Sequence, residues 1–358
     1  MALLALAIVL LVTVGPLGSH LQRPGKPPLG YLREPLGGRR YRVAAWTFGD
    51  APSLAAATKA GAVDEVDFDW YRSQADGTVA AVGEHLNLVA EARDAGLNLF
   101  ATVTNRPRGA GSFSHKLAAA IMATPETRGR HIAALSKMVL QKGYDGIDLD
   151  WEELTAADRQ HFSLFVEGLA EALHLEHRFL SVAVYAKTSE PGTWSQQKAM
   201  DYTRLGAAAD EVKIMTYAYS GAWSQPGPQT PTHWLDQVLT FAESRMPAAK
   251  IAMGVPLFGF DWHAGHAYAV TARGAAATAA RHHAHAARDP ASGEAVLHYS
   301  DAYGVQHVLY YQDVRAVAAK LAFLRRRHPK IGGVALWVMG QETPAMWPAL
   351  RNGLSPQP

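Results

Sequence analysis

The stretch Tyr144–Glu152, which reads Tyr-Asp-Gly-Ile-Asp-Leu-Asp-Trp-Glu, determines how the rest of the chain is interpreted. Within it, Asp148, Asp150 and Glu152 alternate with large apolar residues. Side chains two residues apart share one face of a strand, so three carboxylic acids would lie in a row with Cα atoms about 6.5–7 Å apart. Repulsion between them predicts that at least one acid holds a proton near neutral pH. The pattern indicates an active site.

Two other interpretations fit the same alternation. A half-exposed antiparallel strand also alternates polar and apolar residues, with its acids in water. The three carboxylates could alternatively hold a divalent metal ion. The segment lies, however, between two stretches that we expect to be helical, 125–142 and 156–174. A strand between helices is typical of a parallel sheet covered on both faces, so we favour an active site that binds no metal.

Short apolar runs alternate with helical stretches from residue 41 onward. Eight strands separated by helices predict an α/β fold, specifically a closed (β/α)8 TIM barrel. Functional residues of such barrels cluster at the carboxyl ends of the strands, and Glu152 falls just past the end of the fourth strand. The expected strands span residues 41–47, 63–70, 97–104, 146–151, 179–186, 212–217, 251–256 and 333–338.

The interval between the seventh and eighth strands is too long for one helix. We therefore predict that residues 258–306 form a small α+β insertion within a barrel domain that spans residues 41–354. The run Arg281-His282-His283-Ala284-His285 in this insertion could supply imidazole ligands to a metal. A solvated, alanine-rich helix explains the same run, and we predict no metal site.

The first forty residues have a different composition. Residues 2–14 form an unbroken apolar run, which is short for a membrane span and about right for a signal-peptide core. Residues 1–17 are accordingly predicted to be a signal peptide or an N-terminal membrane anchor, and the protein to be secreted or held in the cell envelope. Residues 18–40 are rich in proline and glycine, which predicts a flexible linker.

Composition narrows the possible partners. The 358 residues are 48% hydrophobic and 18% charged, which suffices for one large core. A formal net charge of +2 gives no indication of nucleic-acid binding. The chain has no cysteine, so disulfides, thiol nucleophiles and cysteine-based zinc sites are excluded. No feature requires a cofactor or an oligomer, and we expect a monomer.

Motifs along most of the chain resemble one enzyme family. Tyr144–Glu152 fits the Asp-x-x-Asp-x-Asp-x-Glu signature of family 18 glycoside hydrolases, with Asp145 as its first acid. The resemblance covers about residues 41–350. Segments similar to other strands of the family are Met215–Tyr217, Gly254–Gly259 and Gly332–Trp337. Segments that resemble the branch of spore-cortex and peptidoglycan N-acetylglucosaminidases are Pro226–Pro228, Phe260–Trp262 and Tyr310–Asp313.

The resemblance implies a glycosidase that cleaves β-1,4 linkages in an N-acetylglucosamine-containing polysaccharide or oligosaccharide, either peptidoglycan strands or chitin. In this family the acetamido oxygen of the substrate replaces a protein nucleophile, with retention of configuration. Glu152 would then be the general acid and base, and Asp150 would orient the acetamido group. Tyr217 would hydrogen-bond the same group. Asp148 would share a proton with Asp150 and help to keep the pKa of Glu152 raised.

Further residues are predicted to bind the sugar. Trp337 would form an apolar floor under it, and other expected substrate contacts are Asn105, Asp145, Trp223 and Trp262. The chain departs from chitinases at Ala218, where they carry Asp or Asn, and at Thr102–Asn105, which replaces their Ser-x-Gly-Gly. A catalytically impaired, chitinase-like sugar-binding protein is therefore the alternative, although such relatives commonly lose the terminal Glu that is present here.

Overall fold

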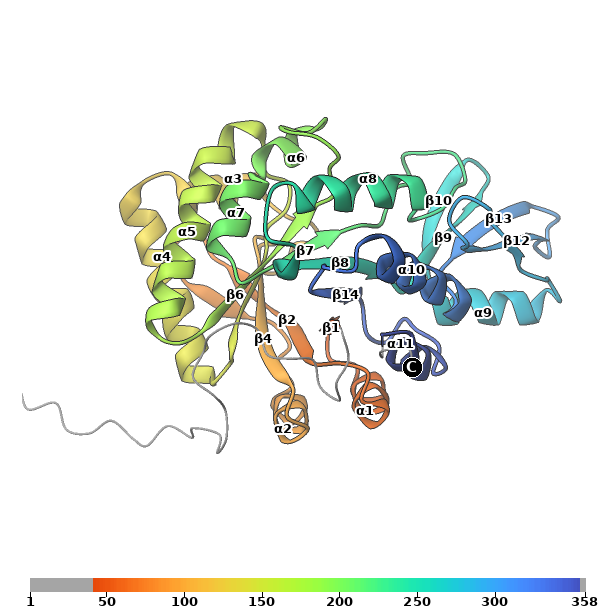
Figure 1. The fold of residues 1–358 in the computed structure, drawn as a ribbon, viewed down its shortest axis with the longest axis horizontal. Coiled ribbons are helices and arrows are strands. Elements are labelled where there is room, and N and C mark those ends of the chain that lie inside the picture. Colours follow the sequence, from red (N-terminus) through yellow and green to blue (C-terminus); the bar gives the residue numbers. More distant parts are fainter. Residues whose placement is uncertain (1–40, 355–358) are drawn as a thin grey trace, which may run out of the picture. The chain divides into compact units, whose positions relative to one another are not determined.

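We describe a computed structural model of the chain, in which residues 41–354 are defined (Figure 1). The predicted signal peptide or anchor and the linker lie outside the described residues. Within the described range, no helix combines the length and apolar character needed to cross a membrane.

Eight parallel strands close into a barrel, as predicted. They follow the order β1-β14-β8-β7-β6-β5-β4-β2, and pairing of β1 with β2 completes the ring. A short strand that sequence reasoning missed, β3 (Val79–Ala81), pairs antiparallel with β2 outside this ring. The barrel strands are β1 (Arg42–Thr47), β2 (Glu65–Ser73), β4 (Asn98–Thr104), β5 (Gly146–Asp150), β6 (Phe179–Tyr185), β7 (Glu211–Met215), β8 (Ile251–Pro256) and β14 (Gly333–Trp337).

Helices connect the strands and cover the outside of the barrel. Helix α4 spans the predicted residues 125–142, because Thr124 caps its first turn and Gly143 ends it in a left-handed conformation. The others are α1 (Ala51–Ala60), α2 (Leu86–Asp94), α3 (His115–Met122), α5 (Arg159–Leu175), α6 (Ser195–Ala199), α7 (Tyr202–Ala208), α8 (Thr232–Glu243), α10 (Val314–Arg327) and α11 (Met346–Leu354). Two short 3-10 turns are η2 (Ala156–Asp158) and η3 (Ala248–Lys250).

The main apolar core lies between the strands and these helices. On β5, Ile147 and Leu149 point outward and are fully buried, as is Trp151 just beyond the strand. The Trp151 ring stacks on Phe165 of α5, with centroids 4.6 Å apart. Trp151 therefore packs in the core, and each such side chain contributes about 1.5–3 kcal/mol through burial. The opposite face of β5 consequently points its acids into the barrel.

The interior of the barrel is polar at its centre. The Lys213 ammonium of β7 lies 2.8 Å from Glu65 and 2.7 Å from Asp67, both on β2, and 3.2 Å from Asp148 on β5. All four side chains are buried. An isolated charge would be very costly to bury, so this lysine and its carboxylates depend on one another.

The predicted α+β insertion follows β8 and contains a second, antiparallel sheet in the order β10-β9-β13-β12-β11, seen at the right of Figure 1. The sheet continues to Tyr311, five residues beyond the predicted boundary. Helix α9 (Ala272–Arg281) ends at Arg281, so the prediction of a helix through His282–His285 is wrong. The strands are β9 (Phe258–His263), β10 (His266–Thr271), β11 (Ala287–Arg288), β12 (Ala295–Ser300) and β13 (Gln306–Tyr311).

Candidate active site

The three acids of the opening motif follow β5 from the barrel interior to its mouth. Asp148 is paired in register with Thr102 of β4 and Ser181 of β6, and Asp150 is paired with Thr104 at the end of β4. Glu152 comes two residues after β5 ends. Asp148 and Asp150 are buried, and Glu152 is partly exposed, so Glu152 is the acid that solvent reaches most easily.

Asp148 is surrounded by protein donors. Its Oδ2 accepts hydrogen bonds from the Trp46 indole at 2.7 Å and the Thr102 hydroxyl at 3.1 Å. Its Oδ1 accepts from the Ser181 hydroxyl at 2.6 Å and lies 3.2 Å from the Lys213 ammonium. These four groups occupy both oxygens of Asp148 within the protein, and the expectation that Asp148 shares a proton with Asp150 stays a prediction. Its position beside a lysine ammonium also makes it a poor ligand for a divalent cation.

Asp150 is the acid best placed to hold the proton. Burial raises its pKa well above the usual range, and the neighbouring Glu152 and Asp148 raise it further. Its Oδ1 is buried and has no hydrogen-bond partner within the protein. An unpartnered buried oxygen costs free energy, so Asp150 is suited to bind a polar group of a ligand.

Glu152 is held by two different residues. Burial raises the pKa of its carboxyl, and a 2.5 Å hydrogen bond from the Tyr185 hydroxyl to Oε2 partly opposes that rise. Its backbone N–H donates to Asn105 Oδ1 at 3.0 Å, and its carbonyl accepts from Asn105 Nδ2 at 2.8 Å. A carboxyl with a raised pKa at a partly open position can donate and recover a proton.

The prediction that Asn105 contacts substrate is contradicted by its position. Its side chain is fully buried, and its amide also donates to the Ser114 carbonyl at 3.2 Å. Both polar atoms are therefore used inside the protein. Asn105 lies at the end of β4, beside the segment that follows β5, and it fixes the backbone of Glu152 instead of touching a sugar.

Tyr217 lies beside the acids, two residues after the end of β7. Burial raises its pKa well above the usual range, and Asp150, Glu152 and Asp148 add to this effect in that order. Its hydroxyl therefore remains a proton donor near the three carboxyl groups. The four residues predicted to be catalytic are brought together at the mouth of the barrel.

Aromatic side chains surround this group. Trp337, at the end of β14, is partly exposed and contacts Trp46 and Phe48 edge-on, with ring centroids 5.3 and 5.8 Å away. Trp46 is the residue that donates to Asp148, so Trp337 lies close to the acids. On another side, Tyr217 packs against Phe258 at 5.9 Å.

Trp223 and Trp262 have different environments, although both were predicted to bind substrate. The Trp223 ring is 64% exposed and lies 6.3 Å from Phe260. Trp262 is only 7% exposed, and its indole N–H is directed to the carbonyls of Gly221 and Ser224, at 3.3 Å each. Trp262 therefore supports the loop that carries Trp223, and direct stacking of a sugar on Trp262 is contradicted by its burial.

Asp145 was also predicted to contact substrate, and this prediction is wrong. It precedes β5, so it stands at the amino end of the strand, away from Glu152. Its Oδ2 accepts a hydrogen bond from the backbone N–H of Leu99 at 3.0 Å. Asp145 thus anchors the start of β5 to β4.

Several residues of the site were missed by sequence reasoning. Tyr185 ends an expected strand at the carboxyl edge of the barrel, and this position was a usable signal. Lys213 interrupts the apolar run of β7, and a lysine there indicates a buried partner. Trp46 gave no comparable sign of its bond to Asp148. Arg106, next to Asn105, lowers the pKa of both Asp150 and Glu152 and so lies near them.

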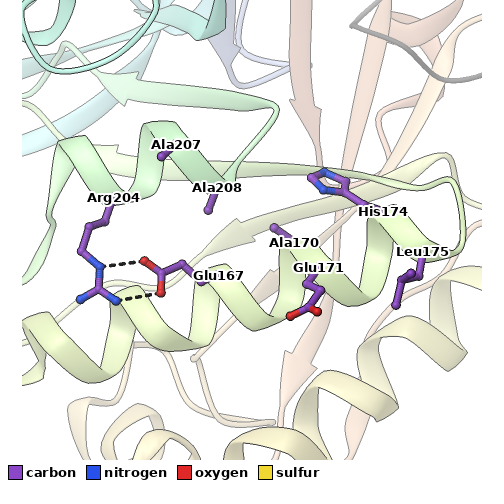
Figure 2. Close-up of a pocket in the computed structure, with 8 residues that line it drawn as sticks. All are labelled: Glu167, Ala170, Glu171, His174, Leu175, Arg204, Ala207 and Ala208. Carbon is purple, nitrogen blue, oxygen red and sulfur yellow. Dashed lines mark hydrogen bonds and ion pairs between the residues drawn. The ribbon is translucent and has the colours of Figure 1, made fainter.

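A hollow of about 650 Å³ lies elsewhere, on the outer surface of α5 and α7 (Figure 2). Arg204 of α7 spans part of it through two hydrogen bonds to Glu167 of α5, at 2.7 and 2.8 Å. The remaining lining is mostly small or aliphatic. The chemistry is concentrated at the mouth of the barrel, and we assign the active site there.

Comparison with known proteins agrees with this geometry. A family model described as glycosyl hydrolases family 18 matches residues 108–342. The chain belongs to glycoside hydrolase family 18. It is thus a glycosidase, related to cortex-lytic enzymes and to chitinases.

Individual proteins resemble the chain at moderate identity. The uncharacterized glycosylase YvbX of Bacillus subtilis is 28% identical over 260 residues, covering 72% of this chain and 75% of YvbX. The cortical fragment-lytic enzyme of Bacillus subtilis is 26% identical over 77% of this chain, which spans only 64% of that enzyme. The crystal structure of a chitinase from Chromobacterium violaceum superposes with a TM-score of 0.82 at 29% identity, covering 88% of this chain and all of that one.

Proposed function

We propose that this family 18 glycosidase hydrolyses β-1,4 bonds next to N-acetylglucosamine, with retention of configuration and with Glu152 as general acid and base. One observation carries the proposal. Glu152 combines a raised pKa, a partly open position and a neighbouring acid, Asp150, whose buried oxygen has no partner. A proton donor beside an unsatisfied polar group suits a substrate that supplies its own nucleophile.

In the first step, the acetamido oxygen attacks the anomeric carbon while Glu152 gives its proton to the leaving glycosidic oxygen. The carbon–oxygen bond breaks, and a cyclic oxazolinium ion forms. The unpartnered oxygen of Asp150 accepts a hydrogen bond from the acetamido N–H, and the Tyr217 hydroxyl donates to the acetamido oxygen. In the second step, Glu152 takes a proton from water, which attacks the anomeric carbon from the face that the leaving group vacated. The bond between that carbon and the acetamido oxygen breaks, and the acetamido group is restored.

Polymer binding is proposed to extend from the acids to the insertion. Trp337 would lie under the sugar at the cleavage point, because its partly exposed ring adjoins Trp46 beside Asp148. Trp223 would stack on a sugar farther along, since its ring is exposed at the end of an aromatic series through Phe260 and Phe258 to Tyr217. Chitin and peptidoglycan both contain such sugars. Because both polymers lie outside the cytoplasm, we infer that the enzyme acts there. We also propose that it acts as a monomer.

The test is to treat chitin oligomers and purified peptidoglycan with the enzyme and to identify the products. Proton NMR at early times should detect the β-anomer, and mass spectrometry should detect chain ends at N-acetylglucosamine from one or both polymers. De-N-acetylated chitin oligomers should resist cleavage, because they lack the attacking oxygen. Early release of the α-anomer, or equal cleavage of the deacetylated oligomer, would contradict the mechanism. Tight oligomer binding with no product would indicate the sugar-binding alternative.

A further inference from the structure

A second group of polar side chains lies in the insertion, on one face of its sheet. Asp261 and His263 are two apart on β9 and therefore share a face. His307 lies on the adjacent strand β13, where Leu309 is paired with Asp261. The two imidazole rings stack with centroids 4.1 Å apart. This group stands beyond the C-terminal end of α9, which covers the apolar part of the same face through Ala275.

Both histidines direct their Nδ1 atoms toward one carboxylate. Asp261 Oδ2 lies 2.9 Å from His307 Nδ1 and 3.9 Å from His263 Nδ1. One ligand atom from each of the three residues lies within 4.8 Å of the others. Two ligand atoms that each lie about 2.0–2.1 Å from a tetrahedral zinc ion are about 3.4 Å apart. The Asp261 and His307 atoms would therefore have to move apart by about 0.5 Å, and the Asp261 and His263 atoms would have to approach by about 0.5 Å.

Unpartnered nitrogen atoms favour a bound ion over simple ring stacking. His263 Nδ1 and His307 Nε2 are both buried without a hydrogen-bond partner. An imidazole that ligates a metal through Nδ1 carries its proton on Nε2 and usually gives it to a nearby carboxylate. Asp301 Oδ2 lies 3.8 Å from His307 Nε2, close to the position that such a carboxylate would take.

The carboxylate itself is held in place. The Tyr299 hydroxyl donates a 2.6 Å hydrogen bond to Asp261 Oδ2, and Asp261 Oδ1 lies 3.0 Å from His307 Nδ1. The Tyr299 ring also stacks on His307, with centroids 4.4 Å apart. Both the ligand oxygen and one ligand ring are therefore restrained by the same tyrosine, which reduces the entropy that binding would cost.

We propose that Asp261, His263 and His307 bind a divalent transition-metal ion of the zinc type. Two imidazoles and one carboxylate suit zinc, and water would complete a tetrahedral set. Asp261 and His263 alternate along β9 with Phe258, Phe260 and Trp262, which face the other way, toward Tyr217 and Trp223. The ion would thus join β9 to β13 behind the aromatic wall and is proposed to stabilise that wall without taking part in glycoside cleavage.

The test uses the full chain without a polyhistidine tag, freed of metal and titrated with Zn²⁺ by calorimetry. One equivalent of Zn²⁺ should bind, and Co²⁺ at the same site should show visible absorption bands of a tetrahedral ion. His263→Ala, which removes a ligand that makes no hydrogen bond, should abolish binding. Asp301→Asn should weaken it by roughly 10–100-fold. The control His298→Ala removes an exposed histidine of β12 and should bind Zn²⁺ like the unaltered chain.

Circular dichroism would show that each variant is folded. Asp261→Asn, which keeps the size of the side chain, provides a second ligand variant and should also lose binding. The proposal is overturned if the unaltered chain binds no Zn²⁺ at micromolar concentrations. It is equally overturned if binding persists in both His263→Ala and Asp261→Asn, because the ion would then lie elsewhere.

Discussion

Replacing Asn105 by alanine tests how the structure holds its proton donor. The side chain makes two hydrogen bonds to the backbone of Glu152, at 3.0 and 2.8 Å, and a third to the Ser114 carbonyl at 3.2 Å. Each buried bond contributes about 0.5–1.5 kcal/mol, so together they contribute roughly 1.5–4.5 kcal/mol. That is a large part of a typical unfolding free energy of about 5–15 kcal/mol. Asn105→Ala should therefore lower the urea midpoint substantially.

The same substitution should affect catalysis in a characteristic way. Without Asn105, the segment that carries Glu152 can move, and a displacement of about 1 Å can lower the rate roughly 100-fold. Because Asn105 is fully buried, we expect kcat to fall while KM for a chromogenic N-acetylglucosamine oligomer changes little. Asn352→Ala, an exposed site on α11, is the control and should alter stability by less than about 0.5 kcal/mol. A raised KM with unchanged kcat and unchanged stability would refute this reasoning and would make Asn105 a substrate contact.

Three further predictions concern other parts of the barrel. Tyr185→Phe removes a hydrogen bond that lowers the pKa of Glu152, so Glu152 should stay protonated to higher pH and the alkaline limb of the kcat/KM profile should shift to higher pH. An alkaline limb that stays at the same pH or shifts to lower pH would contradict the assignment. Lys213→Met leaves three buried carboxylates without their cation and should lower the free energy of unfolding, measured in urea, by about 3–5 kcal/mol. The control Lys137→Met replaces an exposed lysine and should have little effect. Equal stabilities of the two variants would refute the role of the buried ion pairs. Ala218 has a left-handed backbone (φ 60°), so Ala218→Asn should raise the free energy of unfolding by up to about 1 kcal/mol, and a decrease would count against this explanation.

The fold was largely predictable because each barrel strand is a local apolar run between helices. All eight expected strands overlap observed ones, and α4 has its predicted bounds. The short β3 was missed, since three residues are too few to show a periodic pattern. The end of the insertion was misplaced because β13 reads like any other apolar strand, and only its pairing with β9 assigns it to the second sheet.

The candidate site could be predicted from the sequence only for residues that lie on the same strand. The face shared by Asp148 and Asp150 follows from alternation alone. Their partners do not, because Lys213 lies 65 residues beyond Asp148 and meets it only when the barrel closes. Asn105 has the residue type of a sugar ligand, and its burial against Glu152 depends on the packing of two adjacent strand ends. Likewise, the histidines at 282–285 were weighed as metal ligands from the sequence and no metal was predicted there, whereas Asp261, His263 and His307 are brought together only by strand pairing.

The most direct test of the whole account is the hydrolysis of N-acetylglucosamine oligomers by Glu152→Gln. The substitution keeps the shape of the side chain and removes its proton-donating carboxyl. We predict that kcat falls by about 10²–10⁴-fold, equivalent to about 3–5 kcal/mol, with oligomer binding and urea stability retained. Glu171→Gln, on the exposed surface of α5, should remain fully active. If Glu152→Gln retained activity within a few-fold of the unaltered enzyme, the assignment of Glu152 as proton donor would be contradicted.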